Sequence, residues 1–224
     1  MIRIRGLKKS YGKLNALNGV DFNIRRGRIT AYLGANGAGK TTTIKIMLGL
    51  LRQDSGSVEG DYLRSGYVPD QPRFFAWLTG DRLLQLTAEA YGLPAAQARA
   101  TFERYARDLR FDPRDLDRKP WIYSRGNAKK MAYLQSLVIE PDFLIADEPF
   151  SALDPPSIKA VRDMFREFRD GGGTVFLSSH MLAEMERLAD DVVVIRKGEI
   201  AGSFSLAGAA VIDLEREFLR LTEN

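Results

Sequence analysis

The chain has 224 residues, a length that suits one domain, or one domain that carries an insert. Hydrophobic residues make up 45% of the sequence and charged residues 28%, a balance that predicts a folded core and excludes a disordered or low-complexity protein. The net charge of +4 comes from 33 basic and 29 acidic residues that are interleaved rather than gathered in a tract, so the charge pattern does not favour a nucleic-acid partner.

The rarity of cysteine and histidine, and of long apolar runs, excludes further kinds of site and segment. The sequence has no cysteine and one histidine, His180, which excludes disulfides, thiolate metal sites and multi-histidine metal sites. The longest apolar run, residues 74–78, is far shorter than the roughly 18 residues of a membrane-spanning helix. The first residues also lack the apolar segment of a secretory signal. We therefore expect neither a membrane span nor an export signal.

The first third of the chain predicts strands that surround one helix. Ile2 and Ile4 alternate with arginines, and apolar residues alternate with polar ones over 20–24, the period of half-buried strands. A short apolar run at 29–33 leads into the segment GANGAGKT at 34–41. Apolar residues then recur at i, i+3, i+4 and i+7 over 44–51, which predicts a helix with one buried stripe. The order is strand, glycine loop, helix.

The rest of the chain alternates helices and strands after a helical insert. Helices are predicted at 81–91, 95–109 and 126–139 in the insert, and then at 155–171, 181–189 and 206–224. Strands are predicted at 143–146, 174–178 and 192–195, with a hairpin turn at 197–198. This alternation predicts an α/β fold with a mainly parallel sheet.

The predicted domain organisation is one domain spanning residues 1–224. Its catalytic core comprises 1–71, which includes an N-terminal antiparallel β subdomain, and 140–205. An inserted helical subdomain covers 72–139, and the C-terminal helix follows at 206–224.

The glycine-rich segment is the strongest motif, a match to G-x-x-x-x-G-K-[ST] between a strand and a helix, as a P-loop requires. Glycines let backbone N–H groups curl around an anion, and the helix N-terminus adds partial positive charge. Lys40 is predicted to reach the β- and γ-phosphates and Thr41 to bind Mg²⁺. The residues predicted to contact ATP here are Gly34, Asn36, Gly37, Ala38, Gly39, Lys40, Thr41 and Thr42.

The apolar run at 143–146 delivers Asp147 and Glu148 at its C-terminal end, where ligands bind in open parallel sheets. We expect Asp147 to hold Mg²⁺. Glu148 is free of that task and is predicted to orient or deprotonate the water that attacks the γ-phosphate.

With these motifs the sequence resembles the nucleotide-binding subunits of ABC transporters, from about residue 11 to residue 202. The resemblance implies that Tyr11 stacks on adenine and that His180 is the switch histidine that contacts the γ-phosphate. It also identifies SALD at 151–154, which ends in Asp154, with the loop that crosses the dimer interface in this family.

The segment YSRGN at 123–127 resembles the family signature LSGGQ but departs from it at three of five positions. Ser124 and Gly126 survive, and the resemblance implies that they contact the γ-phosphate of the partner subunit's ATP. Arg125 replaces a glycine, which requires either a negative φ with the side chain directed away or a guanidinium along the dimer seam.

The family's metal- and water-sensing glutamine has no single counterpart. The segment GYVPDQ at 66–71 places Asp70 at its position and Gln71 one residue later, so either residue can serve. The YVPD segment at 67–70 and the YSRG segment at 123–126 resemble the corresponding segments of ABC-2 exporters more than those of sugar or amino-acid importers.

Three aromatic residues, Phe74, Phe75 and Trp77, follow directly. In the family this segment helps to line the groove that receives the membrane subunit, and an exposed aromatic cluster suits such a groove. The alternative is that these side chains belong to the core of the helical insert.

The function predicted from these residues is Mg²⁺-dependent ATP binding and hydrolysis by a dimer of identical or different subunits. The dimer is expected to drive a separate integral membrane permease from the cytoplasmic face of the membrane. Two alternatives are a soluble ABC-type ATPase that acts on ribosomes or nucleic acid and a regulatory nucleotide-binding module without turnover. The length leaves no room for the second cassette or long coiled coil of the former, and Glu148 and His180 argue against the latter.

Overall fold

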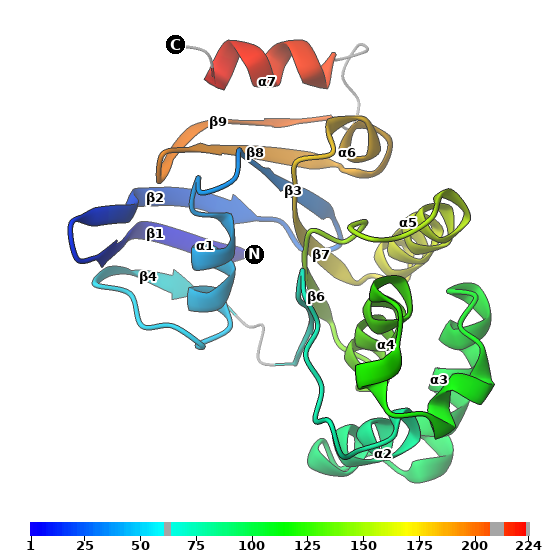
Figure 1. Cartoon of the computed structure of the whole chain (residues 1–224). Coiled ribbons are helices and arrows are strands. Elements are labelled where there is room, and N and C mark those ends of the chain that lie inside the picture. Colours follow the sequence, from blue (N-terminus) through cyan, green and yellow to red (C-terminus); the bar gives the residue numbers. More distant parts are fainter. Residues whose placement is uncertain (61–63, 207–212, 223–224) are drawn as a thin grey trace. The chain divides into compact units, whose positions relative to one another are not determined.

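The computed structural model describes residues 1–60, 64–206 and 213–222. These residues form two compact units, one from the described parts of 1–63 and 174–224 and the other from 64–173. Figure 1 shows their helices and strands in chain order.

An antiparallel sheet opens the first unit. It contains β1 (Ile2–Tyr11), β2 (Leu14–Ile24) and β4 (Ser55–Glu59), in the order β2-β1-β4. Ile2 and Ile4 are buried while Arg3 between them is exposed, which confirms the predicted alternation. The sequence did not indicate β4, because its segment SGSVE has a single apolar residue.

The parallel strands of the first unit are fully covered. They are β3 (Ile29–Leu33), β7 (Thr174–Ser179) and β8 (Asp191–Arg196), and β9 (Glu199–Ser205) is antiparallel to β8, in the order β7-β3-β8-β9. Every residue of β3 and β7 is buried, as parallel strands covered on both faces require. The predicted hairpin turn is confirmed: Lys197 and Gly198 both have positive φ, +48° and +81°, as a type I′ turn demands.

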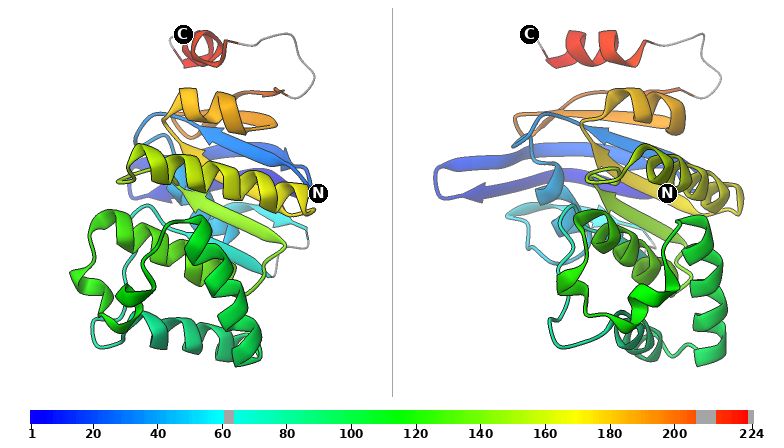
Figure 2. Two further views of the ribbon diagram at one scale, coloured as in Figure 1. Left: turned by 90° about the vertical axis from the view of Figure 1, so that its right-hand side faces the viewer. Right: turned by 45° about the vertical axis from the view of Figure 1, so that its right-hand side comes forward.

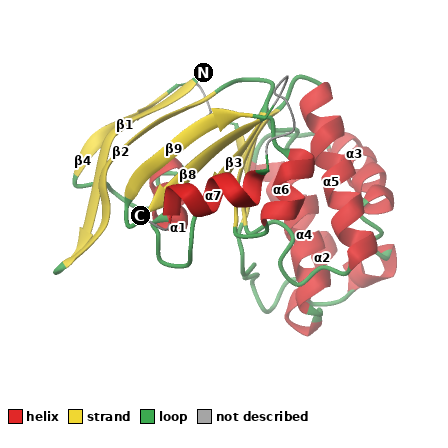
Figure 3. Ribbon diagram, turned by 90° about the horizontal axis from the view of Figure 1, so that it is seen from above, coloured by secondary structure: helices red, strands yellow, loops and turns green. Residues whose placement is uncertain are grey.

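The described residues of this unit include three helices: α1 (Lys40–Met47), α6 (Leu182–Leu188) and α7 (Leu214–Thr222). The expectation that α1 continues to Leu51 was wrong. The helix stops at Met47 because Gly49 adopts a left-handed φ of +69°, which turns the chain away. Figure 3 shows α7 running across β8 and β9, where the Leu221 side chain lies so close to Gly202 that an added Cβ would be 2.9 Å from it. Residues 207–212 and 223–224 of the predicted C-terminal helix lie outside the described residues.

The second unit contains two parallel strands and most of the helices. The strands are β5 (Ser65–Val68) and β6 (Phe143–Asp147). The helices are α2 (Gly80–Ala90), α3 (Ala95–Asp108), α4 (Arg125–Leu137) and α5 (Pro155–Asp170), with short 3-10 helices η1 (Pro113–Asp117) and η2 (Pro120–Ile122) between α3 and α4. Figure 2 shows α2, α3 and α4 packed together. All four α-helices were predicted to within two residues at each end.

Each unit has its own aromatic core. In the first, Phe22, Tyr32 and Phe176 contact one another with ring centroids 5.2–5.8 Å apart. In the second, Phe165 meets the edges of Tyr133 and Phe150 at 5.9 and 6.4 Å. Such pairs add to the free energy gained by burying the rings.

Replacing Phe176 with alanine should lower the free energy of unfolding by about 3–5 kcal/mol, because the fully buried ring leaves a cavity that its neighbours cannot fill. Denaturant titration measures the loss. Phe75→Ala is the control: this ring is 58% exposed, so its loss should cost less than about 1 kcal/mol. Equal losses in the two variants would contradict the burial described here.

Candidate functional site

The first group of candidate residues lies at the carboxyl edge of the parallel strands of the first unit. Leu33 at the end of β3 pairs with Ser179 at the end of β7. Gly34 and His180 therefore leave the sheet side by side, although 146 positions separate them in the sequence. This edge is where open α/β sheets bind ligands.

The path of the glycine loop depends on missing side chains. A Cβ on Gly34 would lie 2.5 Å from the carbonyl oxygen of Ile195 in β8, a distance that real Cβ atoms do not show. Gly39 has a φ of +112°, and a Cβ there would lie 2.7 Å from the carbonyl oxygen of Ala16. These two glycines therefore set the close approach of the loop to β2 and β8.

Helix α1 begins at Lys40, so the unpaired N–H groups of its first turn and its positive dipole end point toward the loop. The Lys40 Nζ donates hydrogen bonds to the carbonyl oxygens of Gly34, at 2.6 Å, and Ala35, at 3.3 Å. Behind the loop, the Thr43 hydroxyl donates to the Gly39 carbonyl at 3.1 Å and shares a hydrogen bond with the buried Tyr32 hydroxyl at 3.2 Å. The arrangement is a preorganised anion site.

Solvent reaches the outer part of this loop. Asn36, Gly37 and Thr41 are exposed and Thr42 is half-buried, whereas Ala38 is buried beneath them. The predicted loop residues thus divide into an exposed surface that a ligand can contact and a buried base that holds the surface in place.

Two further predicted residues of the first unit are exposed. Tyr11 ends β1 with 48% of its surface exposed, and the Lys9 ammonium lies 5.9 Å from the centroid of its ring. His180 directly follows β7, where the Ser179 hydroxyl accepts a hydrogen bond from the Met181 N–H at 3.0 Å and shapes the turn. Both side chains are open to a ligand.

A second group of candidate residues lies within the second unit, at the carboxyl edge of β5 and β6. Val68 pairs with Ala146, so Asp147 and Asp70 come one and two residues after paired positions on neighbouring strands. Asp147 is buried and Glu148 is half-buried. Glu148 has a φ of +47°, a costly backbone state for a residue with a side chain and one that is concentrated at functional sites.

Asp70 and Gln71 differ in their surroundings. The Asp70 carboxylate accepts a hydrogen bond from the Ser151 hydroxyl at 2.8 Å, whereas Gln71 is exposed. Burial raises the pKa of the Tyr67 phenol to about 12, and the charges of Asp147 and Asp70 act in the same direction. Of the two candidates, Asp70 is the one that shares its surroundings with Asp147.

One residue of this site, Lys129 of α4, was missed by the sequence analysis. It is 1% exposed, and its Nζ donates to the carbonyl oxygens of Pro69, Asp70 and Asp147 at 2.8, 3.2 and 3.1 Å. Burial lowers its pKa to about 8, against the opposing influence of the carboxylates of Asp70, Asp147 and Glu148. A lysine in the second turn of a helix normally faces solvent, so only its place on a mostly buried helix could have indicated this role.

The signature segment forms the N-terminus of α4. Ser124 is the N-cap, and its hydroxyl accepts a hydrogen bond from the Asn127 N–H at 3.1 Å. Gly126 lies close to the following loop, where an added Cβ would be 3.1 Å from the Ala152 carbonyl oxygen. Arg125 is exposed in the first turn of α4 and has no positive φ, so the backbone accepts a side chain there.

The other two departures from the family signature both contact Asp115 in η1. The Tyr123 hydroxyl donates to the Asp115 carbonyl oxygen, and the Asn127 side-chain amide donates to the Asp115 carboxylate at 2.8 Å. The Tyr123 ring also meets the edge of Phe111 at 6.2 Å. These residues therefore fasten the start of α4 to the preceding segment.

Asp154 ends the SALD segment as the N-cap of α5. Its carboxylate accepts a hydrogen bond from the Ser157 N–H at 3.0 Å, and bonding to Ser157 lowers the Asp154 pKa. Ala152 in the same loop has a φ of +62°. The loop is thus tightly turned, and the capping hydrogen bond at the start of α5 fixes its last residue, Asp154.

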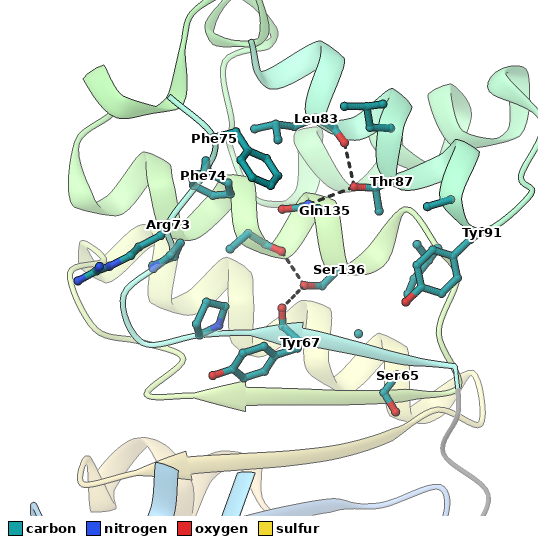
Figure 4. Close-up of a pocket in the computed structure, with 17 residues that line it drawn as sticks. Ser65, Tyr67, Arg73, Phe74, Phe75, Leu83, Thr87, Tyr91, Gln135 and Ser136 are labelled. Carbon is teal, nitrogen blue, oxygen red and sulfur yellow. Dashed lines mark hydrogen bonds between the residues drawn. The ribbon is translucent and has the colours of Figure 1, made fainter. Parts of the chain in front are cut away.

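A pocket of about 480 Å³ opens elsewhere in the second unit, and Figure 4 shows the side chains around it. Phe74, Phe75, Leu83 and Tyr91 contribute apolar walls, with Arg73 at the rim. Polar groups within it are already paired: the Ser136 hydroxyl donates to the Tyr67 carbonyl oxygen at 2.6 Å, and the Gln135 amide donates to the Thr87 hydroxyl at 3.1 Å. Apolar contact is therefore what the pocket offers.

The segment beside this pocket is exposed rather than buried. Phe75 and Trp77 are 58% and 70% exposed, with ring centroids 5.2 Å apart, and Phe74 is half-buried. The alternative that these three aromatic residues form the core of the helical insert is therefore wrong for Phe75 and Trp77.

A glycine loop closed on a lysine at a helix N-terminus, together with an aspartate-glutamate pair at the end of a buried strand, defines a P-loop nucleotide-hydrolysing protein. The profile of the ABC transporter family matches residues 17–151, more than half of the chain. The chain belongs to this family, and it is an ATP-binding subunit that hydrolyses ATP.

Individual relatives agree with this assignment. The lantibiotic transport ATP-binding protein SrtF of Streptococcus pyogenes is 33% identical over 209 residues, which cover 89% of each chain. The ABC-type transporter ATP-binding protein EcsA of Bacillus subtilis is 30% identical over 243 residues, covering 100% of this chain and 97% of EcsA. A solved structure of an ATP-binding subunit of an ABC transporter superposes with a TM-score of 0.88 at 30% identity, covering 97% of this chain and 99% of that one.

Among residues 1–60, 64–206 and 213–222, no helix has the length and apolar character needed to span a membrane.

Gly34→Ala should abolish ATP binding, because its Cβ would collide with the Ile195 carbonyl oxygen and force the loop away from β8. Gly37→Ala is the matched control: its Cβ would meet no atom within 4 Å, and only the positive φ of +79° opposes it, at about 1–2 kcal/mol. Equilibrium binding of a fluorescent ATP analogue compares the two. Equal affinities would show that the close approach does not shape the loop.

Proposed function

We propose that this chain binds and hydrolyses MgATP as one of two paired subunits and so drives the membrane subunit of an exporter. The observation that carries the proposal is which residues stand at the carboxyl ends of parallel strands. In the first unit Gly34, the start of the phosphate loop, lies beside His180. In the second unit Asp70 lies near Asp147. Each pair combines residues that the family uses on a triphosphate and its metal.

In this proposal Lys40 and the loop amides bind the β- and γ-phosphates, and Tyr11 stacks on adenine. Thr41 and Asp147 supply oxygen ligands to Mg²⁺, and a hydroxyl with one carboxylate suits this ion, because Mg²⁺ keeps several waters and phosphate oxygens in its shell. The metal neutralises charge on the phosphates. Glu148 orients or deprotonates the attacking water, with His180 at the γ-phosphate and Asp70, rather than Gln71, as the metal- and water-sensing residue.

The partner subunit completes each site in this proposal. Ser124 and Gly126 stand at the N-terminus of α4, where a hydroxyl and the helix dipole favour an anion. They would contact the γ-phosphate of the ATP held by the partner, with Asp154 at the subunit boundary. Dimerisation then depends on bound ATP.

The membrane subunit docks, we propose, at the pocket beside Phe74, Phe75 and Trp77. Exposed aromatic side chains next to a cavity with apolar walls favour an apolar segment of a partner. Docking there would hold this chain at the cytoplasmic face of the membrane. The name of the Nod factor export ATP-binding protein I of Ralstonia nicotianae, which is 32% identical over 209 residues, supports export as the direction.

Glu148→Gln should leave ATP affinity intact and lower turnover by at least about a hundredfold, because the amide cannot accept a proton from water. The variant should also accumulate as an ATP-bound dimer in size-exclusion chromatography. Lys40→Ala should instead lose ATP binding, since it removes charge that binds the ground-state phosphates. Wild-type turnover in Glu148→Gln would remove Glu148 from the assigned role.

Phe75→Ser and Trp77→Ser should leave the melting temperature and basal ATPase rate unchanged while abolishing co-purification of the membrane subunit from native membranes. Both side chains are exposed, so their loss opens no cavity. Leu50→Ser is the matched control: this leucine is 67% exposed but lies outside the pocket, so the complex should persist. Retention of the membrane subunit by both pocket variants would place the docking surface elsewhere.

A further inference from the structure

One face of α4 carries three polar side chains where an apolar stripe is usual. Lys129, Tyr133 and Ser136 follow one another at i, i+4 and i+7, so they share a face of the helix. Each donates to a backbone carbonyl oxygen outside the helix: Tyr133 to Pro149 at 3.0 Å, and Ser136 to Tyr67 at 2.6 Å, a bond drawn in Figure 4. The face binds the backbone of the end of β5, the end of β6 and the segments that follow these two strands.

Lys129 differs from the other two because it binds both segments at once. Its Nζ donates to Pro69 and Asp70 on the segment after β5, and to Asp147 at the end of β6. An ammonium has three N–H donors, and three carbonyl oxygens surround this one. A buried cation is costly unless its hydrogen bonds are complete and opposite charge is near, and both conditions hold here.

The same helix begins at Ser124 and Gly126. Lys129 lies five positions after Ser124, a little more than one turn. Two hydrogen bonds close this turn: the Ala128 N–H donates to the Ser124 carbonyl oxygen at 2.9 Å, and the Asn127 N–H donates to the Ser124 hydroxyl at 3.1 Å. A force on the start of α4 is therefore transmitted directly to the ammonium. The ammonium in turn holds the backbone on which Asp70 and Asp147 stand.

We infer that Lys129 is a positioning residue for hydrolysis, which ties the start of α4 to the backbone of Asp70 and Asp147 in the same subunit. When Ser124 and Gly126 contact the partner's ATP, the hydrogen bonds of Lys129 fix the positions of the Asp70 and Asp147 carboxylates, which act on the subunit's own ATP. Engagement at one site thereby prepares the other. This inference rests on the proposed roles of Ser124, Gly126, Asp70 and Asp147.

The alternative is that Lys129 only stabilises the fold. Tyr133→Phe is the matched control for this alternative. The variant removes one buried hydrogen bond from the same face of α4, the bond to the Pro149 carbonyl oxygen, which lies beyond Asp147 and Glu148. A structural role predicts that variants at both positions lower the melting temperature and alter turnover in the same proportion. A positioning role predicts that only variants at Lys129 separate turnover from stability.

The experiment compares Lys129→Met, Lys129→Gln and Tyr133→Phe by melting temperature, affinity for a fluorescent ATP analogue, and kcat and KM for ATP. Lys129→Met keeps the length of the side chain without its donors, so kcat should fall at least about tenfold while ATP affinity stays within about twofold, because misplaced catalytic groups lose rate rather than binding. Lys129→Gln keeps a donor without the charge, and its kcat should lie between those of Lys129→Met and wild type. Tyr133→Phe should keep kcat within about twofold.

Wild-type kcat in Lys129→Met would overturn the inference, and so would a fall in kcat that Tyr133→Phe reproduces at the same melting temperature. If Lys129→Met does not fold, Lys129→Gln decides: a kcat below that of Tyr133→Phe supports positioning, and a kcat equal to wild type refutes it. Glu148→Gln is assayed beside them. If Glu148→Gln turns over normally, the proposed site is wrong, a result distinct from failure of the Lys129 variants.

Discussion

The parallel register of strands is the constraint on which both groups of candidate site residues depend, one group in each unit. Parallel strands end at a common edge, so whatever residue follows one strand stands next to the residue that follows its neighbour. The pairing of Leu33 with Ser179 brings the phosphate loop to His180, and the pairing of Val68 with Ala146 brings Asp70 to Asp147. A slip of one residue in either pairing would separate groups that no local sequence holds together.

The departures of the signature from its family pattern have a structural account. A tyrosine and an asparagine in place of leucine and glutamine give the start of α4 two hydrogen bonds to Asp115, one to its backbone and one to its carboxylate. The two residues that the family needs at the triphosphate, Ser124 and Gly126, are kept. Two of the three changed positions therefore orient the segment within its own chain, and the third, Arg125, is exposed.

Much of the fold and the site could be predicted from the sequence, because the relevant signals were local. Apolar runs ended in Gly34 after β3 and in Asp147 at the end of β6, and the helices had clear spacing and clear start and stop residues. The end of α1 could not be predicted from spacing, since Leu48 and Leu51 continue the pattern and only the left-handed Gly49 breaks it. Strands β4 and β5 are short and mostly polar or small, so pairing partners rather than their own residues define them.

Contacts distant in sequence were the other limit. Nothing near Asp70 or Gln71 distinguishes them, and the choice rests on Ser151, 81 positions further along the chain. Lys129 has the composition of a solvent-facing helix residue, and its burial follows from three carbonyl groups on two remote segments. Long-range hydrogen bonds of this kind leave no periodicity in the sequence.

The cap on α4 has a consequence for the direction of a single proton. A serine hydroxyl has one hydrogen and two lone pairs, and the Asn127 N–H occupies one lone pair of Ser124. The hydrogen then points away from the Asn127 N–H and can donate to an acceptor at the end of the helix. Accepting one hydrogen bond also polarises the hydroxyl and makes it a stronger donor. The interaction that starts the helix thus aims and strengthens the O–H group before any acceptor arrives.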